Sequence, residues 1–294
     1  MTVLVTGATG TVGSVVVSQL AAAGLKVRVF TRSPEKAKLP AGVTAFKGEL
    51  LDVDALRAAM DGVKAVFLLC PVVPDELNIT LSILNLCREE KIQAIVYLSV
   101  FRVSDKTSDV PHYASKFAAE RMITDFNLPA TILRPNAYMQ GAGVKDMLMG
   151  PGIFPYPIGS KGVSFVDVRD IAEVAVLEIQ RRLAAKETLG PEFYELVAED
   201  VLTGASGAKL WSEALKRPIN YIGDDLDKWL QGVRRFAPNW MAFDYKYMMK
   251  HFQEDGASAT PADLEHLRKR LGRSPRSYRD FVAESAKQWV EAAK

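Results

Sequence analysis

Three glycines near the start of the chain, Gly7, Gly10 and Gly13, have the spacing GxxGxxG. They separate an apolar run at residues 3–5 from a run at residues 12–23 that suits a buried helix. One glycine allows a tight turn off a strand, a second lets the backbone approach a diphosphate, and a third lets helix and strand pack closely. The diphosphate then lies against N–H groups at the helix N-terminus, where the helix dipole favours negative charge. This predicts a dinucleotide site, with an ordinary strand-to-helix turn as the alternative. The expected contacts here are Gly7, Thr9, Gly10, Thr11, Val12 and Gly13.

The next strand-like run, residues 26–32, ends in a cation. At this position an NAD site uses a carboxylate that accepts hydrogen bonds from the ribose 2′-hydroxyl, whereas an NADP site uses an arginine that receives the 2′-phosphate. Arg32 ends the run and Lys36 follows a turn later, with no carboxylate between strand and loop at the place that NAD would need. The charge therefore favours NADP(H) as cofactor. A solvated loop face is the alternative for both cations.

Strand-like and helix-like segments alternate through the first half of the chain. Further strands are expected at residues 43–47, 65–69, 95–98 and 130–133, and helices at residues 53–60, 75–91 and 112–126, the first two capped by Asp52 and Asp75. Such alternation predicts an α/β fold, a doubly wound, Rossmann-like parallel sheet with helices on both faces. Ligands of these sheets bind beyond the carboxyl ends of the strands. The residues expected at those ends, and so near the cofactor, are Glu49, Leu50, Leu69, Cys70 and Pro71, with Ser99 after the fifth strand.

From about residue 136 the pattern changes. Glycine and proline interrupt residues 136–156 among apolar and aromatic side chains, which indicates either a region that covers a substrate or an irregular cap that only packs. The substrate-binding candidates are Tyr138, Met139, Phe154 and Tyr156. Residues 165–168 look strand-like, Asp170 is expected to cap a helix at 171–183, and residues 208–292 look mostly helical, with aromatic side chains that belong mainly to a core. We expect an NADP-binding domain at 1–155, to which segments near 163–183 return, and a smaller substrate lobe at 156–294, interleaved with it.

Composition and charge exclude several classes of function. The chain has 294 residues, 48% hydrophobic and 24% charged, with a net charge of +2 and three histidines. Without a basic run, nucleic acid is not an expected partner, and no apolar run approaches the length of a membrane span. Cys70 and Cys87 lack metal-ligand spacing, so no metal is expected, and we predict buried free thiols. A strand beginning at residue 2 leaves no room for a targeting peptide, so a cytoplasmic location is expected.

Several motifs together carry a family resemblance. They are Thr6-Gly7-Ala8-Thr9-Gly10 with Gly13, Thr31-Arg32-Ser33, Gly48-Glu49-Leu50-Leu51-Asp52, His112 to Lys116 followed by Glu120, Leu133-Arg134-Pro135-Asn136, Phe165 to Ala172, and Leu271 to Tyr278. In this order they resemble the NmrA-like branch of the atypical short-chain dehydrogenase/reductases, over essentially the whole chain. The resemblance implies the Rossmann-like fold, NADP(H) as cofactor, and Pro135 and Asn136 as further cofactor contacts. That family includes NADPH-dependent quinone, dye and benzylic-ether reductases, and also members that bind the nucleotide and regulate without turnover.

The same resemblance implies where the chemistry occurs. Members of the superfamily use Tyr-x-x-x-Lys, in which the lysine also holds the nicotinamide ribose. Here the residue four before Lys116 is His112, and Tyr113 is three before it, so both rings lie near the lysine on a helix. We predict that Lys116 holds the ribose hydroxyls and donates a proton, directly or through water, with His112 or Tyr113 as a second polar group. Ser99 matches the place of a catalytic serine or threonine. The alternative for Lys116 is a surface pair with Glu120, in the less favourable order along a helix.

The leading functional prediction is an NADPH-dependent reductase of a small hydrophobic or aromatic carbonyl compound, quinone or conjugated substrate. A non-catalytic NADP(H)-binding redox sensor is the first alternative, because the tyrosine of Tyr-x-x-x-Lys is replaced by His112. An epimerase or isomerase that recycles its cofactor is the second, and the same replacement counts against it.

Overall fold

The computed structural model describes residues 1–292. Contacts between Cα atoms divide them into two compact units. The first, called the sheet unit below, comprises Met1–Ser108, His112–Pro135 and Val168–Glu195. The second, the helical unit, comprises Asp109–Pro111, Asn136–Asp167 and the described residues from Leu196 onward. The domain arrangement expected from the sequence stays a prediction.

The sheet unit is built on a seven-stranded sheet in the order β3-β2-β1-β4-β5-β6-β8. Every pair from β3 to β6 is parallel, which confirms the predicted doubly wound, Rossmann-like sheet. The strand order reverses between β1 and β4, and a ligand crevice forms outside the carboxyl ends of the strands at such a switch. The strands are β1 (Thr2–Val5), β2 (Lys26–Thr31), β3 (Thr44–Lys47), β4 (Val63–Leu68), β5 (Ala94–Leu98), β6 (Ala130–Pro135) and β8 (Glu192–Leu196).

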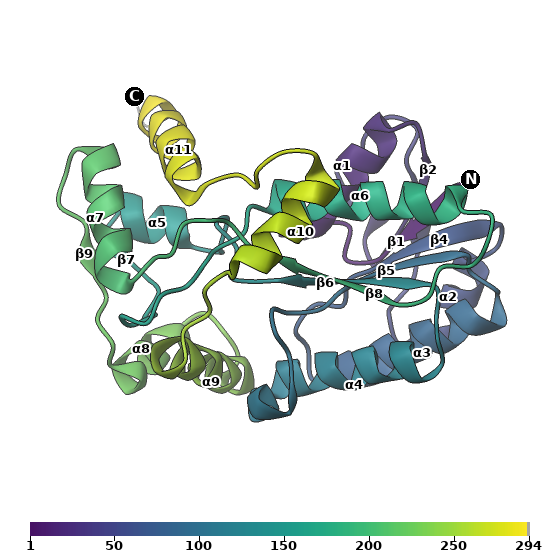
Figure 1. The fold of residues 1–294 in the computed structure, drawn as a ribbon, viewed down its shortest axis with the longest axis horizontal. Helices are drawn as coiled ribbons and strands as arrows, with labels where there is room; N and C mark the ends of the chain where they lie inside the picture. Colours follow the sequence, from purple (N-terminus) through teal and green to yellow (C-terminus); the bar gives the residue numbers. More distant parts are fainter. Residues whose placement is uncertain (293–294) are drawn as a thin grey trace. The chain divides into compact units, whose positions relative to one another are not determined.

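Helices cover both faces of this sheet. Figure 1 shows α1 (Thr11–Ala22) and α6 (Val168–Ala184) on one face, and α2 (Val53–Ala59), α3 (Glu76–Glu89) and α4 (Pro111–Asp125) on the other. The strands β4 and β5 are almost wholly buried, as the uninterrupted apolar runs predict for strands covered on both sides. Asp52 caps α2 by accepting a hydrogen bond from the Ala55 N–H at 2.9 Å, as predicted. Asp75 occupies the N-cap position of α3 but makes no such bond.

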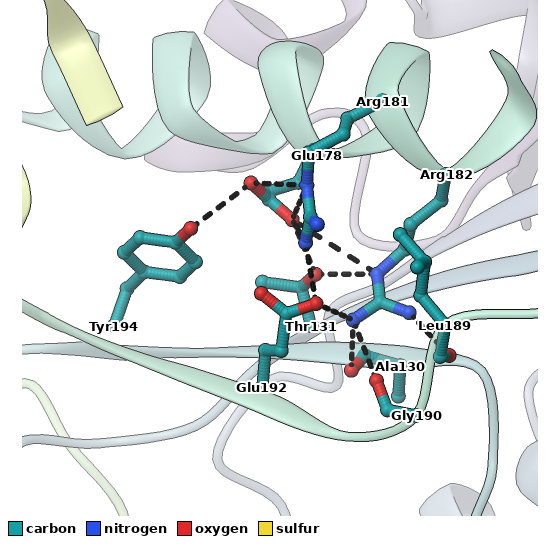
Figure 2. Close-up of polar contacts among 9 residues, drawn as sticks. All are labelled: Ala130, Thr131, Glu178, Arg181, Arg182, Leu189, Gly190, Glu192 and Tyr194. Carbon is teal, nitrogen blue, oxygen red and sulfur yellow. Dashed lines mark hydrogen bonds and ion pairs between the residues drawn. The ribbon is translucent and has the colours of Figure 1, made fainter. Parts of the chain in front are cut away.

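A buried arginine attaches the chain after α6 to β6 (Figure 2). The Arg182 guanidinium, 1% exposed, donates to the Thr131 hydroxyl at 2.6 Å and to the carbonyl oxygens of Ala130 at 2.6 Å, Leu189 at 2.8 Å and Gly190 at 3.0 Å. Burial lowers the pKa of Arg182. Because these carbonyl groups come from β6 and from the connection to β8, the arginine fixes that connection against the sheet.

The carboxylate of Glu178 completes this network. It is fully buried and accepts hydrogen bonds from the Thr131 hydroxyl at 2.8 Å, the Tyr194 hydroxyl at 3.2 Å and the Arg181 guanidinium at 2.7 Å. Arg181 also reaches Glu192 at 2.7 Å, at the start of β8 (Figure 2). A buried carboxylate with several donors is the arrangement expected of a structural ion network.

The helical unit contains eight elements, in agreement with the mostly helical prediction. They are α5 (Val144–Met149), β7 (Ile153–Phe154), α7 (Gly204–Leu215), β9 (Asn220–Tyr221), α8 (Leu226–Val233), α9 (Asn239–Glu254), α10 (Pro261–Leu271) and α11 (Tyr278–Ala292). Strands β7 and β9 pair in parallel as a small second sheet. Among residues 1–292, no helix combines the length and apolarity needed to cross a membrane.

An aromatic cluster forms the core of the helical unit. The rings of Trp211 and Trp289 stack with centroids 5.1 Å apart, and the Trp211 indole N–H donates to the Tyr278 hydroxyl at 3.1 Å. This agrees with the predicted core role of the aromatic residues. Trp240 and Phe243 differ, since they are 39% and 47% exposed on α9.

Three local predictions were wrong. Asp170 lies in the first turn of α6 rather than at its cap, because the helix already begins at Val168. Residues 165–168 form no strand, although Val166 makes an isolated bridge with Tyr138. Residues 136–156 are not an irregular connection throughout, since they contain α5 and β7. The left-handed Gly143 lets so short a helix start directly after a turn, and the frequent glycines conceal the helix in the sequence pattern.

Candidate functional site

The turn after β1 is fixed at the point where the strand order reverses. Gly7 has a φ of +64°, and a Cβ there would lie 2.4 Å from Leu69 Cδ2. Only glycine meets both conditions without strain. The Thr6 hydroxyl donates to the Leu69 carbonyl oxygen and accepts from the Leu69 N–H, each at 2.9 Å. These bonds join the carboxyl ends of β1 and β4, so the predicted contacts Gly7 and Leu69 lie together.

The other two glycines of the triplet have different surroundings. A Cβ on Gly13 would lie 2.1 Å from the Gly7 carbonyl oxygen, so Gly13 allows α1 to pack directly on the turn. A Cβ on Gly10 would meet nothing closer than that same oxygen at 3.4 Å, an ordinary contact. Thr9, Gly10 and Thr11 are exposed. The protein's own packing therefore does not require a glycine at position 10, and the space in front of it is open.

The N-terminus of α1 presents backbone donors to this open space. Gly10 is the N-cap residue and has no side chain with which to cap the helix. The first α-helical bond runs from the Ser14 N–H to the Gly10 carbonyl oxygen, so the N–H groups of Thr11, Val12 and Gly13 precede it. First-turn N–H groups have no partner within their own helix, and the helix dipole makes them a binding site for anions. These residues fit a diphosphate group.

The end of β2 supplies cations. Arg32 follows the last residue of β2, Lys36 ends a short 3₁₀ turn, and both side chains are exposed. Within residues 1–292 neither side chain forms an ion pair. The Gly48 N–H donates to the Thr31 carbonyl oxygen at 3.1 Å, which brings the predicted residues Glu49 and Leu50, after β3, to the neighbouring strand end. The exposed Arg32 and Lys36 fit a phosphate group at this edge.

Lys116 lies deep in the sheet unit. Its ammonium Nζ is 2.7 Å from Glu76 Oε1 on α3 and donates to the Leu98 carbonyl oxygen, at the end of β5, at 3.1 Å. The two side chains are 6% and 3% exposed. The alternative of a surface pair between Lys116 and Glu120 is therefore wrong, because α4 turns both residues inward. Sequence reasoning missed Glu76, whose carboxylate, one residue after the expected cap, looks like an ordinary first-turn acid.

Two further titratable side chains surround this ion pair. Cys70, just after β4, is 4% exposed, and burial raises the pKa of its thiol to about 12, opposed by Lys116 and reinforced by Glu76. Tyr97 on β5 is fully buried with its ring centroid 5.4 Å from Lys116 Nζ. Burial, with the carboxylate of Glu76, raises the pKa of Tyr97 well above its ordinary value. Both groups stay neutral near pH 7, so Cys70 is not a reactive thiolate.

The predicted catalytic serine belongs to a second ion network. The Ser99 hydroxyl donates to Glu120 Oε1 at 2.5 Å. Arg134 binds both oxygens of the same carboxylate, through Nε at 3.0 Å and Nη2 at 2.5 Å, and reaches Glu195 at 3.0 Å. Burial opposes the charge of Arg134, but Glu120 and Glu195 outweigh it and raise its pKa. The Ser99 proton is therefore held by Glu120, which itself lies one turn after Lys116 on α4.

His112 and Tyr113 occupy the first turns of α4. Each is 7% exposed, and their rings meet edge to face with centroids 4.7 Å apart. The structure therefore brings His112, Tyr113 and Lys116 into the buried part of one helix. Pro135 ends β6, and its carbonyl oxygen accepts from the Phe101 N–H at 2.9 Å.

The remaining predicted residues lie in the helical unit. The buried Asn136 amide donates to the Ala257 carbonyl oxygen at 2.7 Å, which anchors the start of that unit. Met139 and Phe154 are 1% and 0% exposed. Their packing role is therefore clear, and their contact with a substrate stays a prediction. Tyr138 and Tyr156 are half-buried, and burial raises the pKa of both phenols. Among the described residues, no three His, Cys, Asp or Glu side chains are grouped so as to hold a metal ion.

Known proteins resemble this chain over most of its length. A model of the NmrA-like family matches residues 1–270. An NAD(P)H azoreductase of Xenophilus azovorans is 29% identical over 79% of this chain and 80% of its own. A (4-alkanoyl-5-oxo-2,5-dihydrofuran-3-yl)methyl phosphate reductase of Streptomyces griseus is also 29% identical, over 98% of this chain and 99% of its own. Among crystal structures, an NADPH-dependent quinone oxidoreductase of Escherichia coli, complexed with NADPH, has a TM-score of 0.81 at 20% identity, over 98% of this chain and 99% of its own. At that identity the likeness is one of fold.

Proposed function

Because the chain belongs to the NmrA-like family, we propose that it is an oxidoreductase that reduces a small hydrophobic or aromatic carbonyl compound, quinone or conjugated substrate with NADPH. The observation that carries the proposal is the open N-terminus of α1 in front of Gly10, at the strand-order reversal. The names of the relatives support it: all three are called reductases or oxidoreductases, and the azoreductase and the quinone oxidoreductase are named with NAD(P)H or NADPH.

In this proposal different groups of residues bind different parts of NADPH. The N–H groups of Thr11, Val12 and Gly13 hold the diphosphate. Arg32 and Lys36 hold the 2′-phosphate and so select NADPH over NADH. Leu69, Cys70 and Pro71 line the end of β4, and Glu49 and Leu50 that of β3. Pro135 and Asn136 remain proposed contacts after β6.

In the proposed reaction, the residues that act on the substrate lie on α4. Bound NADPH supplies a hydride. Lys116 holds a ribose hydroxyl and neutralises the negative charge that develops on the substrate oxygen, by donating a hydrogen bond or its proton. His112 and Tyr113 are the nearest second donors along the helix. Ser99 is the weakest candidate for proton donation to a substrate, because its hydroxyl already donates to Glu120 Oε1.

The test is to follow NADPH absorbance with a panel of quinones, aldehydes, ketones and azo or triarylmethane dyes. Consumption of NADPH in proportion to added substrate supports the reductase, and Lys116→Met should abolish most of it. Lys64→Met, an exposed lysine of β4 outside the site, is the matched control. If NADPH is consumed by neither the wild-type protein nor any variant, the reductase proposal fails.

A second candidate, an NADP(H)-binding sensor without turnover, rests on one observation. Lys116 Nζ already forms an ion pair with Glu76 and donates a hydrogen bond to the Leu98 carbonyl oxygen in the absence of any substrate. Micromolar or tighter NADPH binding, with no turnover across the panel, would support the sensor.

A further inference from the structure

Glu76 differs from the other buried glutamates of the sheet unit. Glu178 accepts hydrogen bonds from Thr131, Tyr194 and Arg181, and Glu120 accepts from Ser99 and Arg134. Apart from its ion pair with Lys116, neither carboxylate oxygen of Glu76 has a hydrogen-bond partner among the described residues. Among the described residues, the Glu76 carboxylate therefore interacts directly only with Lys116.

The free-energy cost of burying the Glu76–Lys116 ion pair indicates that the pair has a role other than stabilising the fold. Both side chains are at least nine-tenths buried, and removing water from two charges costs several kcal/mol per ion unless other hydrogen bonds compensate. Structural ion pairs compensate this cost with additional donors, as Glu120 and Glu178 do. Glu76 accepts no such hydrogen bonds, so the pair is not expected to add much to the stability of the fold. Its effect is to hold the Lys116 ammonium at a defined position.

That place is the edge of the sheet where ligands bind. The Leu98 carbonyl oxygen, which accepts from Lys116 at 3.1 Å, belongs to the last residue of β5. The ammonium donates one hydrogen bond, to Leu98, and pairs with Glu76 by charge, so it keeps N–H capacity for a further acceptor. The position of Nζ is therefore set from two elements, α3 and β5, neither of which carries the lysine.

We propose that Glu76 is a positioning residue of the reduction site, which neutralises the buried ammonium of Lys116 and holds Nζ at the end of β5 with one donor directed to ribose or substrate oxygen. This inference rests on the proposed function. The other titratable groups around the pair are Cys70 after β4, Tyr97 on β5, and His112 and Glu120 on α4. Cys70 and Tyr97 stay neutral over the assay range, and Glu120 is bound by Arg134.

The variants separate charge from packing. Glu76→Gln keeps the size and one acceptor but removes the charge, and Glu76→Asp restores the charge on a shorter stem. Thr80→Val is the matched control, because Thr80 is also on α3, one turn after Glu76, is 1% exposed, and its hydroxyl has no hydrogen-bond partner among the described residues. Lys116→Met identifies the signal of the lysine in spectra of protein labelled with ¹³C at lysine Cε.

The first measurement needs no turnover. Titration of the Lys116 ¹³Cε signal should show that Glu76→Gln loses the proton of the ammonium at a pH lower by about one unit or more than the wild type. Thr80→Val should titrate like the wild type, and Glu76→Asp should fall between the two. Coincident titrations of Glu76→Gln and the wild type would overturn the proposal, whether or not the protein is a reductase.

The second measurement uses NADPH oxidation by the full-length protein. The alkaline limb of the kcat profile should move to lower pH in Glu76→Gln, with kcat reduced about tenfold at pH 8 and KM for NADPH changed less. Glu76→Asp should recover part of the loss. A uniform loss at every pH that Glu76→Asp does not recover would assign Glu76 a structural role only and overturn the proposal. A wild-type protein without turnover refutes the reductase, whereas the titration still decides the role of Glu76.

Discussion

The carbonyl oxygen of Gly7 lies 2.1 Å from the place that a Cβ on Gly13 would occupy, so helix α1 and the turn before it touch through backbone alone. Gly13→Ala should therefore lower the stability of the fold by about 1–3 kcal/mol, because two backbone segments must move apart. Urea unfolding followed by circular dichroism measures this change.

Gly10→Ala should leave the stability of the fold nearly unchanged but weaken NADPH binding. Its Cβ meets only an ordinary contact at 3.4 Å, and the φ of −82° suits alanine, so stability should stay within about 0.5 kcal/mol of the wild type. NADPH affinity should fall tenfold or more, on the order of 1.4 kcal/mol, because the methyl group enters the space proposed for the diphosphate. Fluorescence titration with NADPH checks this. Unchanged affinity would contradict the proposed diphosphate site.

Arg32 is expected to determine cofactor choice. Arg32→Ala removes a charged donor proposed for the 2′-phosphate, so NADPH affinity should fall by about 1.5–3 kcal/mol while NADH affinity changes little. Lys26→Ala, an exposed cation at the opposite end of the same strand, is the control and should affect neither. Isothermal titration calorimetry with both nucleotides makes the comparison. Equal losses for the two nucleotides with Arg32→Ala would refute the phosphate contact.

The Arg182 network should carry a large share of the stability of the sheet unit. Arg182→Met leaves the carbonyl groups of Leu189 and Gly190 without their donor and removes a charge beside the buried Glu178, so we expect a loss of about 3–5 kcal/mol. Arg121→Met, which breaks an exposed ion pair with Asp125, should cost about 0.5 kcal/mol or less. Chemical unfolding compares them. A loss at Arg182 no larger than at Arg121 would show that the buried bonds contribute little.

The helical unit contains a histidine whose charge depends on pH. Burial opposes the charged form of His251, but its hydrogen bonds to Asp109 at 2.7 Å and Asp255 at 3.0 Å outweigh this and raise its pKa above 6.5. A raised pKa in the folded state means that the stabilisation is complete below pH 6.5 and is lost as the pH rises through the pKa of the folded protein. Thermal unfolding from pH 5.5 to pH 8.5 should show this decline, and His251→Gln should remove the part of it that His251 causes.

Much of the sheet unit could be predicted from the sequence. The buried strands β4 and β5 are continuous apolar runs, and Asp52 caps α2 by a contact only three residues away. Such local patterns are visible in a sequence, as is the spacing of Gly7, Gly10 and Gly13.

The ion pairs of the site could not be predicted in the same way. Glu76 and Lys116 come from different helices, and their contact depends on how α3 and α4 pack on the same face of the sheet. The sequence pattern suggested Glu120 as partner because it lies one turn away on the same helix. Glu120 instead binds Ser99, just after β5, and Arg134 on β6, since burial of its side of α4 favours partners on the sheet.

From Ser108 onward the chain passes between the two units five times, and this has a practical consequence for truncation experiments. Each unit is assembled from three separate stretches, one of them only Asp109–Pro111. A stop codon after Glu195 would keep the whole sheet unit but leave it attached to incomplete pieces of the helical unit, and a start at Asp109 would do the converse, so neither unit can be produced alone by truncation. Point substitutions or circular permutation within the full-length gene are therefore the appropriate tools, and a shortened clone that fails to express says nothing about the nucleotide site.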